Sequence, residues 1–408
     1  MIAESLSIKF RIARRDWPTL LMGLAVFLMP LLTLHVPLSL AILLPVLTIS
    51  AILGRILMGT PRFRFNIIST VFVAAIVVAA AVSAGWSYSA DLTWEKLPRT
   101  AMIALLGTVL LAAMSGLERA QTRTLTKAFL FGIILTFALL VSERVIGEFL
   151  IRTDLIDSGM NKFLNTFNRP LSLFAILLWP AVAILTDKRP VYGVAGVVLC
   201  LAIFAAFQTA AAIAAVAFGA LIFVCVYMAP RIMAPLTGVL LGISIFLAPT
   251  IDYILPEPKE MFEKLNLPRS AYHRLLVWQF TGDRIAERPL VGWGFNTSRA
   301  IPGGKKNLDV SEVALPLHPH NAALQWRLEL GVLGALLGAG LFVVAIVCAQ
   351  RYGRNRMAQA AGTATVASAF CVAMLSFGAW QSWWLSGLFV IAGITVLACR
   401  NPDRPVDT

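Results

Sequence analysis

Four side chains in this sequence could move a proton or bind phosphate groups: His320, Arg169, Arg274 and Arg288. A histidine has an ordinary pKa near ~6.5, so it can accept a proton from a hydroxyl group, or orient that group, near neutral pH. The arginine fork stays charged and binds phosphate oxygens in pairs. We therefore select His320 as the candidate catalytic residue and the three arginines as candidate substrate ligands.

His320 belongs to the run His318-Pro319-His320-Asn321. Pro319 disfavours helix at His318 and Asn321 is a good N-cap, so we expect a helix to begin at or just after His320. The imidazole would then lie beside a helix N-terminus, which favours anions. The alternative is a helix-end histidine that only hydrogen-bonds a loop.

Arg274 and Arg288 lie in one polar stretch. Within this stretch, the spacing that places residues on one face of a helix is shown by Tyr272, Leu275, Leu276, Gln279 and Phe280. We expect an amphipathic helix over 270–285 on the outer membrane surface, from which Arg274 could instead snorkel without binding substrate. Arg288 lies between Glu287, with which it could pair, and Pro289, which indicates a shaped turn.

Arg169 comes from a different part of the chain. It stands between Asn168 and Pro170 at the start of an apolar segment, and proline suits a first helical turn. We expect a cation at the outer interface, next to a helix N-terminus. Its alternative role is that of an interface anchor.

Membrane-spanning helices must position these side chains. The chain is 59% hydrophobic and 13% charged, with a mean hydropathy of +0.81. Soluble domains are about half apolar and a quarter charged. The net charge of +13 is scattered in short clusters, as orientation signals are, so we expect no nucleic-acid partner. The five cysteines show no Cys-x-x-Cys spacing, and we predict neither a zinc site nor any cofactor.

The hydrophobic pattern predicts an all-α polytopic membrane protein. The twelve expected spans lie near 17–35, 37–54, 66–86, 100–116, 128–143, 168–186, 190–207, 209–228, 232–250, 325–348, 358–377 and 384–399. We divide the chain into 1–250 with nine helices, 251–324 as a long outer loop with short amphipathic helices, and 325–408 with three helices and a short tail. Lysines and arginines in the short loops place both termini in the cytoplasm.

Three motifs around the long loop carry a resemblance. They are Tyr272-His273-Arg274-Leu-Leu-Val-Trp278, then Glu287-Arg288-Pro289-Leu290-Val291-Gly292-Trp293-Gly294, and finally His320-Asn321, nine residues and Gly331-Val332-Leu333-Gly334. With the twelve spans, this set resembles the O-antigen ligase family, which shares the loop and motifs with the O-antigen polymerases.

The resemblance implies a GT-C-like glycosyltransferase in the inner membrane of a Gram-negative bacterium, with its site on the periplasmic face. It would move a glycan from undecaprenyl pyrophosphate to a sugar hydroxyl of lipid A–core without a metal. Arg169, Arg274 and Arg288 would hold the pyrophosphate, and His320 would activate or position the acceptor. Many relatives carry a Ser-Arg pair near Gln208, where this chain has no arginine, so that cation is either missing or supplied from elsewhere, such as by Arg152 or Lys162.

Two alternatives stay open. A polymerase would extend one lipid-linked glycan with another, and it differs from a ligase only in its acceptor. A transporter is the alternative from another class. The spans are poor in intramembrane charge and show no paired broken helices, which argues against a transporter.

Two further features bear on the helix after the loop. Glu329 lies within an apolar span, so we expect it to face the bundle interior, either paired with Arg327 or in a structural or proton-handling role. The tryptophans Trp380, Trp383 and Trp384 are typical of an interfacial aromatic belt, and they could also line a lipid groove.

Overall fold

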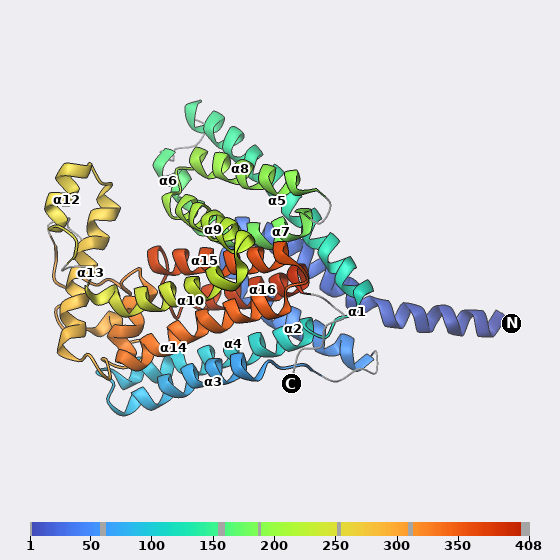
Figure 1. Ribbon diagram of the computed structural model, residues 1–408, viewed down its shortest axis with the longest axis horizontal. Coiled ribbons are helices and arrows are strands. Elements are labelled where there is room, and N and C mark those ends of the chain that lie inside the picture. The colour runs from blue at the N-terminus through green and yellow to red at the C-terminus, as the bar shows by residue number, and fades with distance from the viewer. Residues whose placement is uncertain are drawn as a thin grey trace.

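The fold is an almost entirely helical bundle (Figure 1), seen in a computed structural model that describes residues 2–57, 63–153, 160–186, 189–250, 254–308 and 313–400. These ranges contain two isolated β-bridges and no strand. The prediction of an all-α polytopic membrane protein is therefore confirmed.

The helices follow the predicted spans closely. They are α1 (Ile2–His35), α2 (Leu40–Leu57), α3 (Ile67–Val82), α4 (Ala90–Met114), α5 (Arg119–Arg152), α6 (Met160–Thr166), α7 (Asn168–Thr186), α8 (Pro190–Ala206), α9 (Ala210–Met228), α10 (Pro230–Leu247), α12 (Pro258–Leu265), α13 (Arg269–Glu287), α14 (Ala322–Tyr352), α15 (Arg356–Leu375) and α16 (Ser382–Cys399). Short 3-10 turns are η1 (Pro37–Ser39), η2 (Ser83–Gly85), η3 (Ala248–Thr250) and η4 (Ser298–Ala300).

Eleven of the described helices are long and apolar enough to cross a membrane. The remaining predicted span, 190–207, forms α8, which is apolar but only 17 residues long. At ~1.5 Å per residue, α8 still covers most of a hydrocarbon layer about 30 Å thick.

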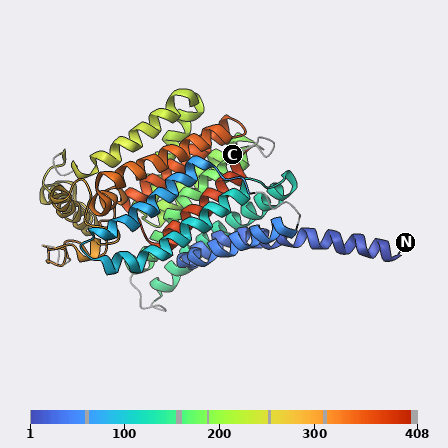
Figure 2. The ribbon, with the colours of Figure 1, turned by 90° about the horizontal axis from the view of Figure 1, so that it is seen from below.

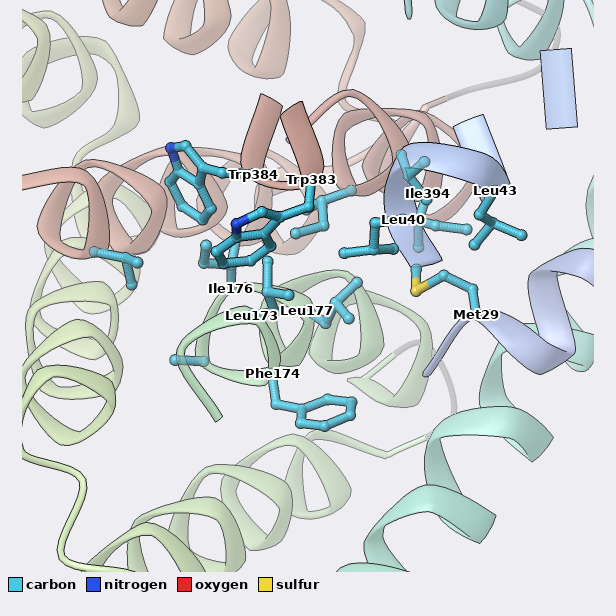
Figure 3. Packing of buried hydrophobic residues seen from close by; sticks show 14 of the residues in the cluster. Met29, Leu40, Leu43, Leu173, Phe174, Ile176, Leu177, Trp383, Trp384 and Ile394 are labelled. Atoms are coloured by element: carbon cyan, nitrogen blue, oxygen red, sulfur yellow. The ribbon is translucent and has the colours of Figure 1, made fainter. Parts of the chain in front are cut away.

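Helix α7 lies at the centre of the bundle, packed against α8, α9, α15 and α16. In its most apolar stretch 83% of the residues are buried, the highest share among the candidate spans. Figure 3 shows Leu173 and Leu177 of α7 pointing toward Trp383, while Phe174 points to the other side of the helix. The N-terminus of α7, which carries Arg169, is thus fixed by a closely packed core.

One end of the bundle carries the long loop with α12 and α13, and the chain's N-terminus extends from the opposite end (Figures 1 and 2). We call the first the loop end. The expected amphipathic helix exists as α13, but its buried face is made by Tyr272, His273, Val277, Thr281 and Ile285. This face differs from the predicted one because α13 packs on the start of α14, in a small core with Leu324 and Leu328.

Candidate active site

Helix α14 is broken at Gly331, whose φ of 62° and ψ of −146° are not helical. The segment 290–294 fills this break. It makes three backbone hydrogen bonds with α14: Trp293 N donates to Leu328 O, Gly294 N donates to Glu329 O, and Val332 N donates to Leu290 O. A fourth bond, from Gly292 N to Arg288 O, closes the turn of the loop itself. A Cβ at Gly331 would lie 2.1 Å from the oxygen of Leu290, so only glycine fits. Gly292 and Gly331 therefore serve a close backbone contact between loop and helix.

Glu329 lies just before the break and is fully buried. Its carboxylate accepts hydrogen bonds from the backbone amides of Asn296 and Ser298, the Ser298 hydroxyl, the Gln325 amide and the Trp380 indole. The expectation that it faces the interior is confirmed, while Arg327 is not among these partners. A buried carboxyl group is costly in free energy unless hydrogen-bond donors surround it. Through these donors, Glu329 links α14 to η4 and to Trp380.

The α15–α16 turn, residues 376–381, is held against the start of α14. Gln325 accepts a hydrogen bond from the backbone amide of Ala379 at 2.7 Å, and Trp380 donates to Glu329 at 2.6 Å. Trp380, Trp383 and Trp384 are 6%, 7% and 1% exposed, so the prediction of an interfacial aromatic belt is wrong. These rings pack inside the protein because the turn folds inward over α14.

His320 lies between this turn and α14. As predicted, Asn321 is the N-cap of α14, and its side chain accepts a hydrogen bond from Leu324 N at 3.1 Å. His320 itself has a φ of 55°, an uncommon conformation for a residue with a side chain. Its Nδ1 lies 3.0 Å from the carbonyl oxygen of Ser376. Since a carbonyl only accepts, Nδ1 carries a hydrogen, and Nε2 is the nitrogen that can take up a proton.

His318 supports the conformation of His320. Its Nδ1 accepts a hydrogen bond from the backbone amide of His320 at 3.2 Å, and the Gln381 amide lies 3.1 Å from its Nε2. Burial lowers the pKa of His318 to about 3, helped by the nearby charges of His320, Arg299 and Arg274. His318 is therefore neutral near pH 7 and acts here as a hydrogen-bonding support.

Arg274 reaches the same turn from α13. Its Nη1 donates to the carbonyl oxygen of Leu375 at 2.7 Å, so Arg274 and His320 are bound to consecutive carbonyls at the end of α15. Burial lowers the pKa of Arg274, yet an arginine keeps its charge at neutral pH. None of the ion pairs found among the described residues involves Arg274.

Three further cations lie at this end of the bundle and were missed by the sequence reasoning. They are Lys96, Arg99 and Arg299. Lys96 Nζ lies 3.2 Å from the hydroxyl of Ser382, at the start of α16, and the charges of both arginines act on it. Arg299 follows Ser298, which Glu329 holds in place. One signal was available in the sequence, namely the position of Arg299 in the loop between two of the three motifs.

Of the predicted ligands, Arg169 joins this group and Arg288 does not. Arg169 begins α7, is exposed and has its guanidinium carbon 6.0 Å from the ring of Trp383, next to Ser382. Arg288 lies beyond the far end of α13, with its guanidinium carbon 4.3 Å above the ring of Trp293. Fourteen residues separate it from Arg274, which is about 21 Å along a helix.

The predicted turn at Gln208 is present, with a φ of 55°. A cation lies beside it, because Arg144 Nε donates to Ala206 O at 3.1 Å. Arg152 instead pairs with Glu148 and is exposed, and the side chain of Lys162 lies outside the described residues.

Comparison with known proteins adds to this geometry. A model of the family described as O-Antigen ligase matches residues 194–339. The resemblance to the O-antigen ligase family is confirmed. The O-antigen ligase match runs from α8 into α14, so it contains Arg274, Arg288 and His320, whereas Arg169 and the α15–α16 turn lie outside it.

Curated relatives agree with this assignment. Proteins of Rickettsia conorii, Rickettsia felis and Rickettsia prowazekii, each named "Putative polysaccharide ligase", are 34%, 32% and 33% identical to this chain over 157 residues. Each alignment covers 37% of this chain and 38% of the relative, so the chain matches well under half the length of the curated relatives.

Proposed function

We propose that this protein is an O-antigen ligase that transfers a glycan from undecaprenyl pyrophosphate to a sugar hydroxyl of lipid A–core. The observation that carries the proposal is the pairing of His320 and Arg274 on the carbonyls of Ser376 and Leu375. A proton acceptor and a phosphate-binding cation thereby lie side by side at the loop end, next to the N-terminus of a membrane-spanning helix.

The reaction that suits these groups is a single displacement at the anomeric carbon. The acceptor oxygen forms a bond to that carbon while the bond to the pyrophosphate oxygen breaks, and the hydroxyl proton passes to His320 Nε2. The carbonyl of Ser376 holds the opposite nitrogen, so the tautomer is set for this step.

The pyrophosphate leaves with more negative charge than it carried in the donor. Arg274 and His320 lie on adjacent carbonyls, and the charges of both Arg274 and Arg299 act on His318, which hydrogen-bonds to His320. Cations already fixed where charge develops favour the transition state. We assign them to the leaving pyrophosphate, with Arg169 and Lys96 at the edge of the same site.

Arg288 stays a predicted donor ligand, but its contact with Trp293 supports a different role. A guanidinium stacked on an indole stabilises the segment that fills the break in α14. The location that goes with this function is the inner membrane of a Gram-negative bacterium, with the loop end in the periplasm and both termini in the cytoplasm.

The test is glycan transfer by the purified protein, supplied with undecaprenyl-pyrophosphate glycan and lipid A–core. Wild type is compared with His320→Ala, and with His35→Ala as a matched control because His35 is an exposed histidine at the end of α1. We expect transfer by wild type and the control, and a loss of about 10²–10⁴-fold in His320→Ala, the usual contribution of a general base.

Two other outcomes would change the proposed acceptor or the proposed role of His320. Lengthening of the lipid-linked glycan, without transfer to lipid A–core, would identify a polymerase and leave the site intact. Undiminished transfer by His320→Ala would remove the catalytic role of His320.

A further inference from the structure

A cavity lies at the end of the bundle opposite the loop end. Its volume is about 910 Å³, and it is bounded by the end of α9, the start of α10, the last turns of α14 and the start of α15. Its walls are mainly aliphatic, from Ile232, Ala234, Val239, Val343, Ile346 and Val347. Ile232, Val239 and Val347 are 63%, 56% and 51% exposed, so the groove opens sideways from the bundle.

Three arginines stand at one end of this groove, and no acidic residue is among the residues that line it. Arg231 is the second residue of α10, Arg351 lies in the last turn of α14, and Arg356 is the first residue of α15. Two helix N-termini also point here, and they add partial positive charge. The groove thus combines an apolar channel with a cationic end.

The walls of the groove are held in place by a pair of glutamines. Gln350 Nε2 donates to the carbonyl of Gln359, and Gln359 Nε2 donates to the carbonyl of Gln350, at 3.2 and 2.8 Å. Gln350 also donates to the Thr363 hydroxyl at 2.8 Å. These bonds join α14 to α15 and fix the walls of the groove, and the glutamine amides are already engaged.

We propose that this groove binds an anionic phospholipid. Its acyl chain lies along the aliphatic walls between α10 and α14, and its phosphate is bound by Arg231 and Arg356 with Arg351 beside them. A basic pocket between membrane helices selects anionic head groups, and a pocket lined by aliphatic side chains requires a hydrocarbon chain as well. A small soluble anion would use the arginines and leave the apolar channel empty.

The inference is independent of the proposed function, because the groove lies at the other end of the helices. A lipid bound only by the folded protein raises its stability by mass action. The bound lipid would bridge α10 and the α14–α15 pair on the outer surface of the bundle. Its expected effect is therefore on thermal stability and on lipid retention.

The experiment measures thermal unfolding of the detergent-purified protein with added phosphatidylglycerol or phosphatidylcholine. Wild type is compared with the double variant Arg231→Gln/Arg356→Gln. Arg189→Gln is the matched control, because Arg189 is an exposed arginine before α8 at the same end and outside the groove. We expect phosphatidylglycerol to raise the Tm of wild type and control more than phosphatidylcholine does. The double variant should bind phosphatidylglycerol roughly tenfold or more weakly.

A second variant tests the apolar channel with the arginines intact. Gly238 lines the channel, and a Cβ there would meet Val343 and Ile346 at 3.6 and 3.9 Å, which are ordinary contact distances. The further side-chain atoms of Gly238→Leu would occupy space in the channel itself. This variant should also lose the response to phosphatidylglycerol, which keeps the proposal testable if the double variant fails to fold.

Four results would overturn the proposal. Three of them are equal stabilisation by the two lipids, an unchanged phosphatidylglycerol response in both groove variants, and full stabilisation by glycerol 3-phosphate alone. The last would indicate a soluble-anion site. A shift to dimer that removes the lipid response would assign the groove to a second copy of the chain.

Discussion

Glu329 and Arg274 are both ionisable and both held near the start of α14, but their polar groups are satisfied in opposite ways. Glu329 is sealed from solvent and accepts five hydrogen bonds from neutral donors. Arg274 donates to one backbone carbonyl and has other cations and histidines as its neighbours. The difference indicates that the carboxylate is a structural centre, while the cations keep positive charge available for an anionic ligand.

Between Glu329 and Arg274, the larger expected effect on transfer comes from removing the charge of Arg274. In Arg274→Gln we expect kcat for glycan transfer to fall by roughly 10²–10³-fold, as when a preorganised donor to a developing anion is lost. Arg274→Lys should recover only part of this, because an ammonium cannot bind two phosphate oxygens as a fork does.

The control is Arg269→Gln, which changes an exposed arginine at the start of the same helix and should leave kcat close to wild type. Full activity of Arg274→Lys would show that only a local positive charge is needed. Full activity of Arg274→Gln would remove Arg274 from the site.

Substitution of Glu329 should above all lower the stability of the folded protein. Glu329→Ala leaves several buried donors without an acceptor, and we expect the free energy of unfolding to fall by about 2–4 kcal/mol. Glu329→Gln keeps the volume and one acceptor oxygen, so its loss should be smaller. The measurement is the Tm in detergent, with Glu95→Ala as the control, because Glu95 is an exposed acid on α4.

If Glu329 also transfers a proton during the reaction, its role is not purely structural, and the activity of its variants would show this. Glu329→Gln would then abolish transfer while the Tm stayed near that of wild type. A purely structural Glu329 predicts that activity and Tm fall together.

The pattern of spans, the helix α13 and the cap at Asn321 could be predicted because each depends on local sequence. Arg274 and His320 were selected from motifs, and the structure brings both to the end of α15. The part that the α15–α16 turn plays in the site was missed, because the turn has no charged residue and acts through backbone carbonyls that no motif reports. The break at Gly331 was missed for a similar reason, because an apolar run looks continuous when its backbone partner comes from forty residues away in sequence.

A smaller effect concerns pH. The folded pKa of His318 is lowered to about 3 from an ordinary value of 6.5, so the unfolded chain binds more protons between these values. Stability from this residue is therefore complete above about pH 6.5 and is lost as the pH falls toward 3. His318→Asn should show a flatter decline of Tm between about pH 7 and pH 4 than wild type does. An equal decline in both proteins would mean that other groups cause it.

Replacing Arg288 should give the smallest effect. It tests whether Arg288 belongs to the group of cations at the loop end. Its guanidinium stacks on Trp293, and a partly exposed contact of this kind contributes about 0.5–1 kcal/mol. Arg288→Gln should therefore lower the Tm slightly and change kcat/KM by about fivefold at most, the factor that corresponds to 1 kcal/mol. Steady-state transfer assays at varied donor concentration measure this. A rise in KM for the donor that matches that of Arg274→Gln would contradict the structural role, because it would require the pyrophosphate-linked substrate to extend along the whole of α13. The cation group at the loop end would then include both ends of that helix.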